Sequence, residues 1–219
     1  MLTSASGQPL PHERKSSSKG YNYLLPSIDA GLQPRMGEYL RRRSLCVRTS
    51  HHNLWYPSSD AGDTEPRIVI PATSQLAHNK FWQARYIGVD ASVPRYQSPY
   101  SDRGDALVIM YPISKEDNRI VVVTEGPMCA LAAAALGFVS VALMGIAPTQ
   151  DALMHLRDYV KGRTLRMIAD ADQTHGMAKV MLRLHAVGCR APCEILTTYP
   201  SKDLADATLA DRERILGIS

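Results

Sequence analysis

The chain has 219 residues, of which 45% are hydrophobic and 21% are charged, and its net charge at neutral pH is +4. This composition excludes an intrinsically disordered chain and predicts a globular core in one or two domains. No apolar run reaches the roughly 18 residues that a membrane helix needs, the start at Met1 lacks an apolar signal core, and the four cysteines lack disulfide-like spacing. We therefore expect a cytoplasmic protein with no membrane partner.

Positive charge is concentrated in the amino-terminal part of the chain. Residues 1–50 hold eight Lys and Arg against three Asp and Glu, a net charge of +5, so the remaining residues carry about −1. Such a region favours a polyanionic partner, most commonly nucleic acid, although a solvated basic helix would have the same composition. Residues 1–34 are rich in Ser, Gly and Pro and predict a flexible basic arm.

Residues 35–118 predict a small basic α+β subdomain. A helix is expected from Met36 onward, because Tyr39 and Leu40 fit a helical apolar pattern around the arginines that follow. The β-rich runs at 67–72 and 80–88 flank a polar turn and predict a hairpin.

From residue 119 to 200, strands alternate with helices. Strands are expected at 119–124, 138–144, 164–170 and 193–199, and helices at 127–136, 149–160 (capped by Thr149) and 177–187. Strands that are apolar on both faces and separated by helices predict an α/β fold with a parallel sheet covered on both sides. Residues 201–219 are expected to form a short acidic motif and one helix.

Carboxylates follow two of the predicted strands. Glu125 comes directly after the first strand, and Asp170 and Asp172 come at the end of the third. Ligands of such sheets bind outside the carboxyl ends of the strands, so we expect these groups to share one site. The two aspartates supply the hard oxygen ligands that Mg²⁺ prefers, and Glu125 could complete the metal site or transfer a proton. Such a site suits phosphoryl chemistry.

These motifs, with the elements around them, resemble the Toprim-domain catalytic core of bacterial-type (DnaG-like) and phage DNA primases. Glu125-Gly126 and Asp170-x-Asp172 match the two acidic Toprim motifs. The other matching elements occur in the same order as in that family: Tyr39–Leu45, Ile68–Pro71, Gln83–Arg85, Pro94–Pro99 and the K-D-x-x-D motif Lys202–Asp206.

The resemblance implies a Toprim-type sheet and a set of residue roles. The catalytic residues would be Glu125, Asp170 and Asp172, which would also bind the metal together with Asp203 and Asp206. The residues that bind nucleic acid or nucleotide would be Lys80, Arg85, Arg95, Tyr96 and Lys202. The implied cofactor is Mg²⁺, with Mn²⁺ as an alternative, and we expect no structural zinc.

The implied reaction is Mg²⁺-dependent synthesis of short RNA primers by nucleotidyl transfer. Its partners would be a single-stranded DNA template, ribonucleoside triphosphates and a replicative helicase or other replisome protein. A stand-alone core of this kind would suit a phage or other mobile element, and would then act in the bacterial host cytoplasm.

Two departures from the family pattern leave other functions open. Cys129 stands where the family's E-G-x-x-D motif has its aspartate, and the loop after Asp172 is one residue longer than usual. A Toprim nuclease that cleaves phosphodiester bonds would use the same carboxylates, although the primase-like elements between Tyr39 and Ser98 argue against it. A non-catalytic DNA-binding replication accessory is the other alternative, and Cys129 is the residue that supports it.

Overall fold

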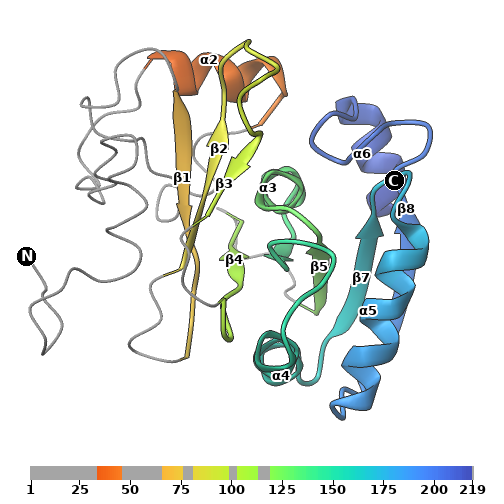
Figure 1. Ribbon diagram of the computed structural model, residues 1–219. Coiled ribbons are helices and arrows are strands. Elements are labelled where there is room, and N and C mark those ends of the chain that lie inside the picture. The colour runs from red at the N-terminus through yellow and green to blue at the C-terminus, as the bar shows by residue number, and fades with distance from the viewer. Residues whose placement is uncertain (1–33, 46–65, 76–80, 99–102, 113–118, 219) are drawn as a thin grey trace, which may run out of the picture.

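The structure of the chain is a computed structural model that describes residues 34–45, 66–75, 81–98, 103–112 and 119–218. The predicted basic arm and Lys80 lie outside the described residues. The described part contains two β-sheets with helices packed around them (Figure 1). Among the described residues, no helix combines the length and the apolar character needed to cross a membrane.

The amino-terminal part contains a three-stranded antiparallel sheet. Its strands β1 (Arg67–Pro71), β2 (Trp82–Tyr86) and β3 (Tyr96–Gln97) lie in the order β1-β2-β3, with Val69 opposite Ala84 in the register of β1 and β2. The helix α2 (Pro34–Arg42) precedes them and buries Met36 and Leu40, which are four residues apart and therefore share one face. The predicted helix and hairpin are confirmed, whereas β3 was not predicted.

The second sheet has five strands in the order β4-β6-β5-β7-β8. The strands β5 (Ile120–Thr124), β6 (Val139–Ala142), β7 (Thr164–Ala169) and β8 (Cys193–Thr197) are parallel, which confirms the predicted fold class. The edge strand β4 (Val108–Met110) runs antiparallel to β6. Because β4 precedes residue 119, the sheet includes a strand from outside the range predicted for it.

Helices cover both faces of this sheet. The helix α3 (Pro127–Ala135), α6 (Leu209–Leu216) and the amino-terminal sheet share one hydrophobic core with β5, whereas α4 (Gln150–Tyr159) and α5 (Thr174–Ala186) share a second core. Alternation along β5 explains the division, since Val122 faces the first core and its neighbours Val121 and Val123 face the second.

Two helix starts illustrate how the local sequence sets these elements. Thr149 caps α4 as predicted, because its side chain accepts a hydrogen bond from the Ala152 N–H at 3.1 Å. The start of α5 was predicted at Met177, but the helix begins three residues earlier and includes Gly176 in its first turn. A Cβ at Gly176 would lie 2.6 Å from a side-chain carbon of Ile146, so the glycine permits close packing rather than ending the helix.

Candidate active site

The carboxyl ends of β5 and β7 meet at a topological switch point of the five-stranded sheet. The chain leaves β5 through α3 to reach β6 on one side, and β7 lies on the other side of β5. Crevices at such switch points are the usual ligand sites of open α/β sheets. Glu125 directly follows β5 and Asp170 directly follows β7, so both residues lie at this edge of the sheet, where a ligand crevice is expected.

Electrostatic coupling shows that the predicted carboxylates lie near one another. The pKa of Asp170 is raised to about 7 by burial and by the negative charges of Asp203, Glu125 and Asp172, while Lys202 opposes this shift. The pKa of Glu125 is also raised, by burial and by the charge of Asp172. The structure therefore concentrates negative charge at one edge of the sheet, an arrangement that a bound cation would relieve.

The acidic loop, which we define as residues 202–206, is anchored next to the Asp170 turn. The Ala171 N–H donates to the Lys202 carbonyl at 3.1 Å, and the Thr198 N–H donates to the Ala169 carbonyl at 3.1 Å. Within the loop, a carboxylate oxygen of Asp203 accepts from the Asp206 N–H at 2.8 Å. Lys202 itself is exposed, so its ammonium can reach a bound phosphate.

Asp206 has a partner that the sequence did not predict. Its carboxylate lies 2.6 Å from a guanidinium nitrogen of Arg43, at the end of α2. Arg43 also stacks over the ring of Tyr39, with 4.9 Å between the guanidinium carbon and the ring centroid. Asp206 is thus paired with a cation, whereas the negative charge of Asp203 acts on the Asp170 carboxyl group.

A buried arginine fixes the acidic loop from the other side. Arg212 on α6 is 1% exposed, and its guanidinium donates to the Leu204 and Ala205 carbonyls at 2.9 and 2.8 Å. It also donates to the carbonyls of Arg43 and Ser44, the latter at 3.1 Å. One side chain therefore joins the acidic loop, α6 and the end of α2 through four backbone carbonyls.

Cys129 lies inside this arrangement. The thiol is buried on α3, and its pKa is raised by burial and by the negative charges of Asp203 and Asp170, against the opposing effect of the Ala205 and Leu204 N–H groups. It therefore remains protonated and neutral at physiological pH. A neutral thiol is also a poor ligand for Mg²⁺, so Cys129 does not replace the charge of an aspartate at this position.

The predicted nucleic-acid-binding residues of the amino-terminal sheet occupy three different environments. Arg85 is 6% exposed and lies between two tyrosines, because its Nε donates to the Tyr39 hydroxyl at 3.1 Å and its guanidinium lies 5.0 Å from the Tyr96 ring centroid. Tyr96 is half-buried, and its hydroxyl would lie 3.7 Å from a Cβ added to Gly126, the residue after Glu125. Arg95 is exposed.

The donor set agrees with a divalent cation of the Mg²⁺ or Mn²⁺ type, because carboxylate oxygens are the ligands that hard cations prefer. Glu125, Asp170 and Asp172 have such oxygens at this edge of the sheet, and Asp203 has them near Asp170. Within the part of the chain that the structure describes, no three His, Cys, Asp or Glu side chains lie close enough to form a metal-binding group. The donor atoms are of the type that the ion prefers. These carboxylates lie at one edge of the sheet but are not close enough together to enclose an ion.

Arginines that support the site were missed by the sequence analysis. Besides Arg43 and Arg212, Arg103 donates to the carbonyls of Met144 and Ala147, both at 2.7 Å, and so holds the loop after β6. Glu125 contacts the same loop, since its carbonyl accepts from the Gly145 N–H at 3.0 Å. No local signal identifies these arginines, because each has a partner at least 41 residues away in the chain.

No family model and no curated protein matches the chain. Among solved structures, the Aquifex aeolicus primase with its zinc-binding and RNA polymerase domains is similar at a TM-score of 0.59 and 17% identity, covering 84% of this chain and 55% of that chain. The chain therefore spans little more than half of that protein's length.

Two further solved structures have the same fold. The DnaG catalytic core gives a TM-score of 0.57 at 13% identity and covers 95% of this chain and 78% of that chain. A DnaG primase catalytic domain bound to single-stranded DNA gives a TM-score of 0.55 at 14% identity and covers 93% of this chain and 74% of that chain. The chain thus has the fold of the DnaG primase catalytic core, and the resemblance predicted from its motifs is confirmed at the level of the fold.

Proposed function

We propose that the chain is a primase-like nucleotidyltransferase that synthesises short RNA primers on single-stranded DNA. The observation that carries the proposal is the group of mutually repelling carboxylates around Asp170, which lies at the switch point of a sheet with the fold of the primase core. Carboxylates that raise one another's pKa at a crevice are typical of functional sites, because a structural role rarely requires like charges to be held together.

The proposed reaction joins the 3′-oxygen of one ribonucleotide to the α-phosphorus of the next and releases pyrophosphate. When bound, Mg²⁺ would offset the charge that develops on the triphosphate. Asp170 and Asp172 would hold this ion. Glu125, whose pKa is raised, is suited to accept the proton of the attacking hydroxyl, since a raised pKa makes a carboxylate a stronger base. Lys202, which is exposed beside the same crevice, would contact the triphosphate.

The DNA template would lie along the amino-terminal sheet. Arg95 is exposed next to Tyr96, whose hydroxyl approaches Gly126, so this sheet connects the basic part of the chain with the carboxylates. A structural neighbour, the DnaG catalytic domain, binds single-stranded DNA. Arg85 would act indirectly, by fixing the Tyr96 ring, because its guanidinium is buried between tyrosines.

This function implies the partners and setting expected from the sequence. The ligands would be single-stranded DNA and ribonucleoside triphosphates, and a replicative helicase or other replisome protein would supply template. The protein would then act in the bacterial cytoplasm, encoded by the bacterium or by a phage or other mobile element.

Cys129 favours a second candidate, a DNA-binding replication accessory without catalysis. Its thiol stays neutral beside Asp203 and Asp170. The site therefore has one negative charge fewer than the family motif implies. If that charge is needed for metal binding, the protein would bind DNA without synthesis.

One assay distinguishes these functions. The purified protein is incubated with single-stranded DNA, Mg²⁺ and labelled ribonucleoside triphosphates, and the products are separated by size. We expect oligoribonucleotides, and we expect Asp170→Asn to reduce their yield by about 1,000-fold, a typical loss when a group that acts only in the transition state is removed. Asp151→Asn is the matched control, because Asp151 is an exposed carboxylate on the first turn of α4.

Each other outcome identifies a different function. Shortened template that depends on Asp170 would indicate a nuclease. Binding of DNA without product, at every Mg²⁺ and Mn²⁺ concentration, would indicate the accessory. Equal loss of product in Asp170→Asn and Asp151→Asn would contradict a catalytic role for the carboxylate edge.

A further inference from the structure

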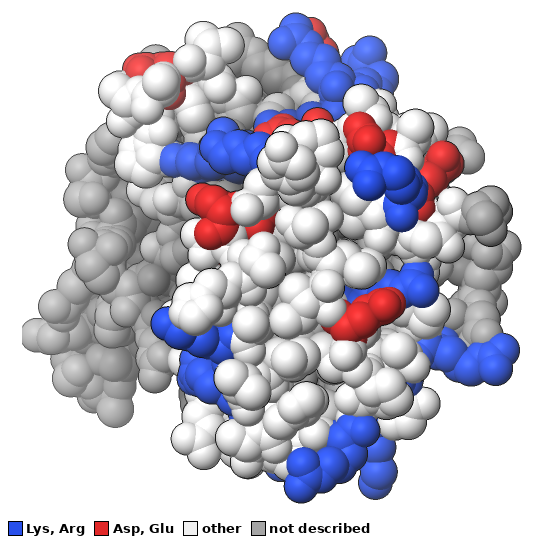
Figure 2. All heavy atoms as spheres, turned by 90° about the vertical axis from the view of Figure 1, so that its right-hand side faces the viewer, with Lys and Arg blue, Asp and Glu red and all other residues white. Residues whose placement is uncertain are grey.

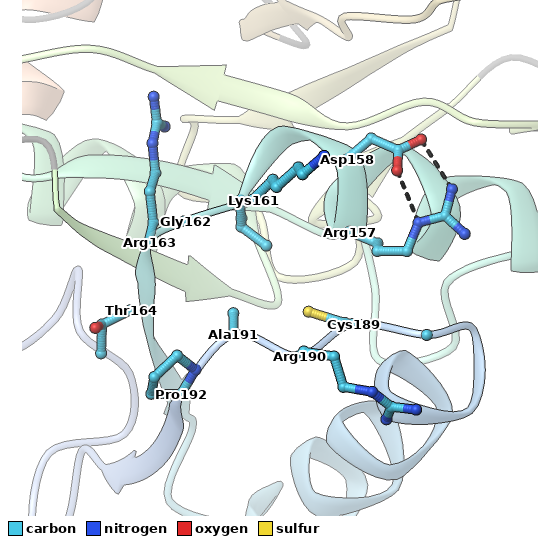
Figure 3. A pocket seen from close by; sticks show the side chains of 12 residues that line it. Arg157, Asp158, Lys161, Gly162, Arg163, Thr164, Cys189, Arg190, Ala191 and Pro192 are labelled. Carbon is cyan, nitrogen blue, oxygen red and sulfur yellow. Dashed lines mark hydrogen bonds and ion pairs between the residues drawn. The ribbon is translucent and has the colours of Figure 1, made fainter.

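A pocket of about 580 Å³ opens at the amino ends of β7 and β8, the edge of the sheet opposite to the carboxylates. It is formed by the end of α4 and by two loops, residues 160–164 before β7 and residues 188–192 before β8. Figure 3 shows Lys161, Gly162 and Arg163 on one side of the pocket and Cys189, Arg190 and Ala191 on the other. The volume falls in the usual range for small-ligand pockets, roughly 300–1,000 Å³.

The charged lining of the pocket is strongly basic. It comprises four cationic side chains and one carboxylate, a net charge of +3: Arg157, Lys161, Arg163, Arg190 and Asp158. The carboxylate is already paired, because Asp158 accepts two hydrogen bonds from the Arg157 guanidinium at 2.7 and 3.0 Å. Of the other three cations, Lys161 and Arg190 are exposed and can turn toward an anionic ligand.

The ends of two helices do not account for this charge. Cations often lie at helix carboxyl ends, where each helix contributes about half a negative charge, so α4 and α5 together offset about one positive charge. Arg157 serves that purpose, since it also donates to the Val187 carbonyl beyond α5 at 3.0 Å. A surplus of roughly two positive charges remains around the pocket after this offset.

The individual cations are placed differently with respect to a ligand. Lys161 and Arg190 are exposed and belong to opposite loops. Arg163 lies with its guanidinium 4.9 Å from the ring centroid of Tyr159, and its buried Nη1 has no hydrogen-bond partner among the described residues. Arg163 and Arg190 extend outward in Figure 3, so Arg190, being exposed, would turn inward to contact a ligand.

We propose that this pocket binds a small ligand that carries two or more linked phosphates, such as pyrophosphate or a nucleoside polyphosphate. Linked phosphates match cations that come from two sides of one hollow, and arginine binds phosphate oxygens through paired N–H groups. Nucleic acid fits less well, because a strand needs a charged groove along its backbone, whereas Lys161 and Arg190 belong to the two loops that line a single hollow. The proposal does not depend on primer synthesis.

The pocket is separate from the candidate active site. The strands between the two edges are five to six residues long, and at about 3.3 Å per residue they separate the edges by roughly 16–20 Å. A polyphosphate can therefore bind at the amino edge without occupying the crevice beside Asp170. This separation also permits the two sites to be tested independently.

The test measures binding of pyrophosphate and of ATP to the full chain by calorimetry in EDTA. Without divalent cations, the carboxylate edge repels polyphosphates, so binding reports the pocket. We expect Lys161→Glu combined with Arg190→Glu to weaken binding of both probes by about tenfold or more. The matched control combines Lys179→Glu with Arg214→Glu, which makes the same change in net charge at two exposed cations outside the pocket, and its affinity should stay within about twofold of the parent.

Three outcomes would overturn the proposal. An equal loss of pyrophosphate and ATP affinity in the two double variants would mean that net charge alone attracts the probes. No binding of either probe at about 1 mM would mean that the pocket is not a polyphosphate site. A pocket variant that loses binding to a single-stranded oligonucleotide but keeps pyrophosphate binding would assign the cations to nucleic acid. Thermal unfolding of all variants verifies that each remains folded.

Discussion

The two edges of the five-stranded sheet carry opposite charge. Carboxylates gather at the carboxyl edge, where burial and neighbouring negative charges raise the pKa of Asp170 to about 7. At the amino edge, hydrogen bonds from Arg157 lower the pKa of Asp158, and three further cations surround a pocket. In Figure 2, the coloured residues at the lower end of the α5 side are Lys and Arg, whereas the upper part of that face carries residues of both signs.

The two edges differ in whether their carboxylates have a cationic partner. Asp158 lies beside a guanidinium, so its ionised form is stabilised by the fold. Asp170 lies among other carboxylates, so the fold holds its ionised form at a cost in free energy that protonation or a bound cation would remove. We therefore expect metal-dependent chemistry at the carboxyl edge, where the carboxylates around Asp170 repel one another. The surplus of cations at the amino edge is suited to binding an anionic ligand.

Removing the arginine that anchors the carboxylate edge should have the largest effect. Arg212→Met leaves four backbone carbonyls without their donor, two of them in buried hydrogen bonds, and we expect a loss of about 3–5 kcal/mol in the free energy of unfolding. Urea denaturation measures this loss. We also expect the affinity for Mn²⁺, measured by electron paramagnetic resonance, to fall about fivefold or more, because the acidic loop is no longer fixed beside Asp170.

Arg67→Met provides the matched control for that prediction. Arg67 is equally buried, at 1% exposed, and donates to the Ala84 and Pro94 carbonyls at 3.3 and 3.0 Å, but it lies in the amino-terminal sheet. We expect it to lose about 2 kcal/mol of stability with Mn²⁺ affinity unchanged. A similar loss of Mn²⁺ affinity in both variants would mean that Arg212 stabilises the fold without positioning the acidic loop.

Restoring the aspartate of the family motif should sharpen the contrast between the edges. Cys129→Asp adds a carboxylate next to Asp203 and Asp170, so in EDTA we expect the free energy of unfolding to fall by about 2 kcal/mol at pH 8. Saturating Mg²⁺ should recover most of this loss and should increase primer synthesis. Cys129→Ala is the uncharged control, and a Cys129→Asp protein whose stability does not respond to Mg²⁺ would contradict a metal role for this edge.

The pH dependence of stability should differ between the two edges. The pKa of Asp170 is raised, so its contribution to stability is present at low pH and is lost as the pH rises through about 7. In EDTA, we expect the Tm to fall by about 3 °C between pH 5 and pH 8, equivalent to about 1 kcal/mol after allowance for solvent screening. Asp170→Asn should remove this fall.

Asp158→Asn is the control from the opposite edge. Its pKa is lowered by Arg157, so its stabilising effect is present above the unfolded-state pKa and is lost only in acid below that value. The Tm difference between pH 5 and pH 8 should therefore be the same as in the parent protein. Calorimetry of the parent and the two variants measures these Tm differences. A smaller difference in Asp158→Asn, or an unchanged one in Asp170→Asn, would contradict the assignment of the pH dependence to Asp170.

Periodicity and strand-end carboxylates were sufficient to predict the sheet and the region of the site. The strands β5 to β8 are apolar on both faces, which only a covered parallel sheet explains, and Glu125 and Asp170 follow two of them. Short elements were missed, because the two residues of β3 and the three of β4 carry too little periodicity to be recognised. The start of α5 was predicted three residues too late, and Gly176 in its first turn packs closely against Ile146.

Partnerships between distant arginines and acidic or backbone groups could not be predicted. Arg85 has the sequence appearance of a surface charge, but the fold buries it between Tyr39 and Tyr96. Asp206 was expected to help bind the metal, and the structure pairs it with Arg43. Such contacts depend on which elements the tertiary structure brings together, and local sequence does not contain that information.

The contact of Arg212 with the end of α2 joins residues that are 168 positions apart, from Ser44 to Arg212. A ribosome makes the chain from its amino end, so every carboxylate of the site is synthesised before the side chain that fixes their loop. A product interrupted just before Arg212 would therefore contain all the acidic residues without their final arrangement. We infer that the acidic loop is fixed beside the Asp170 turn only after α6 has been synthesised.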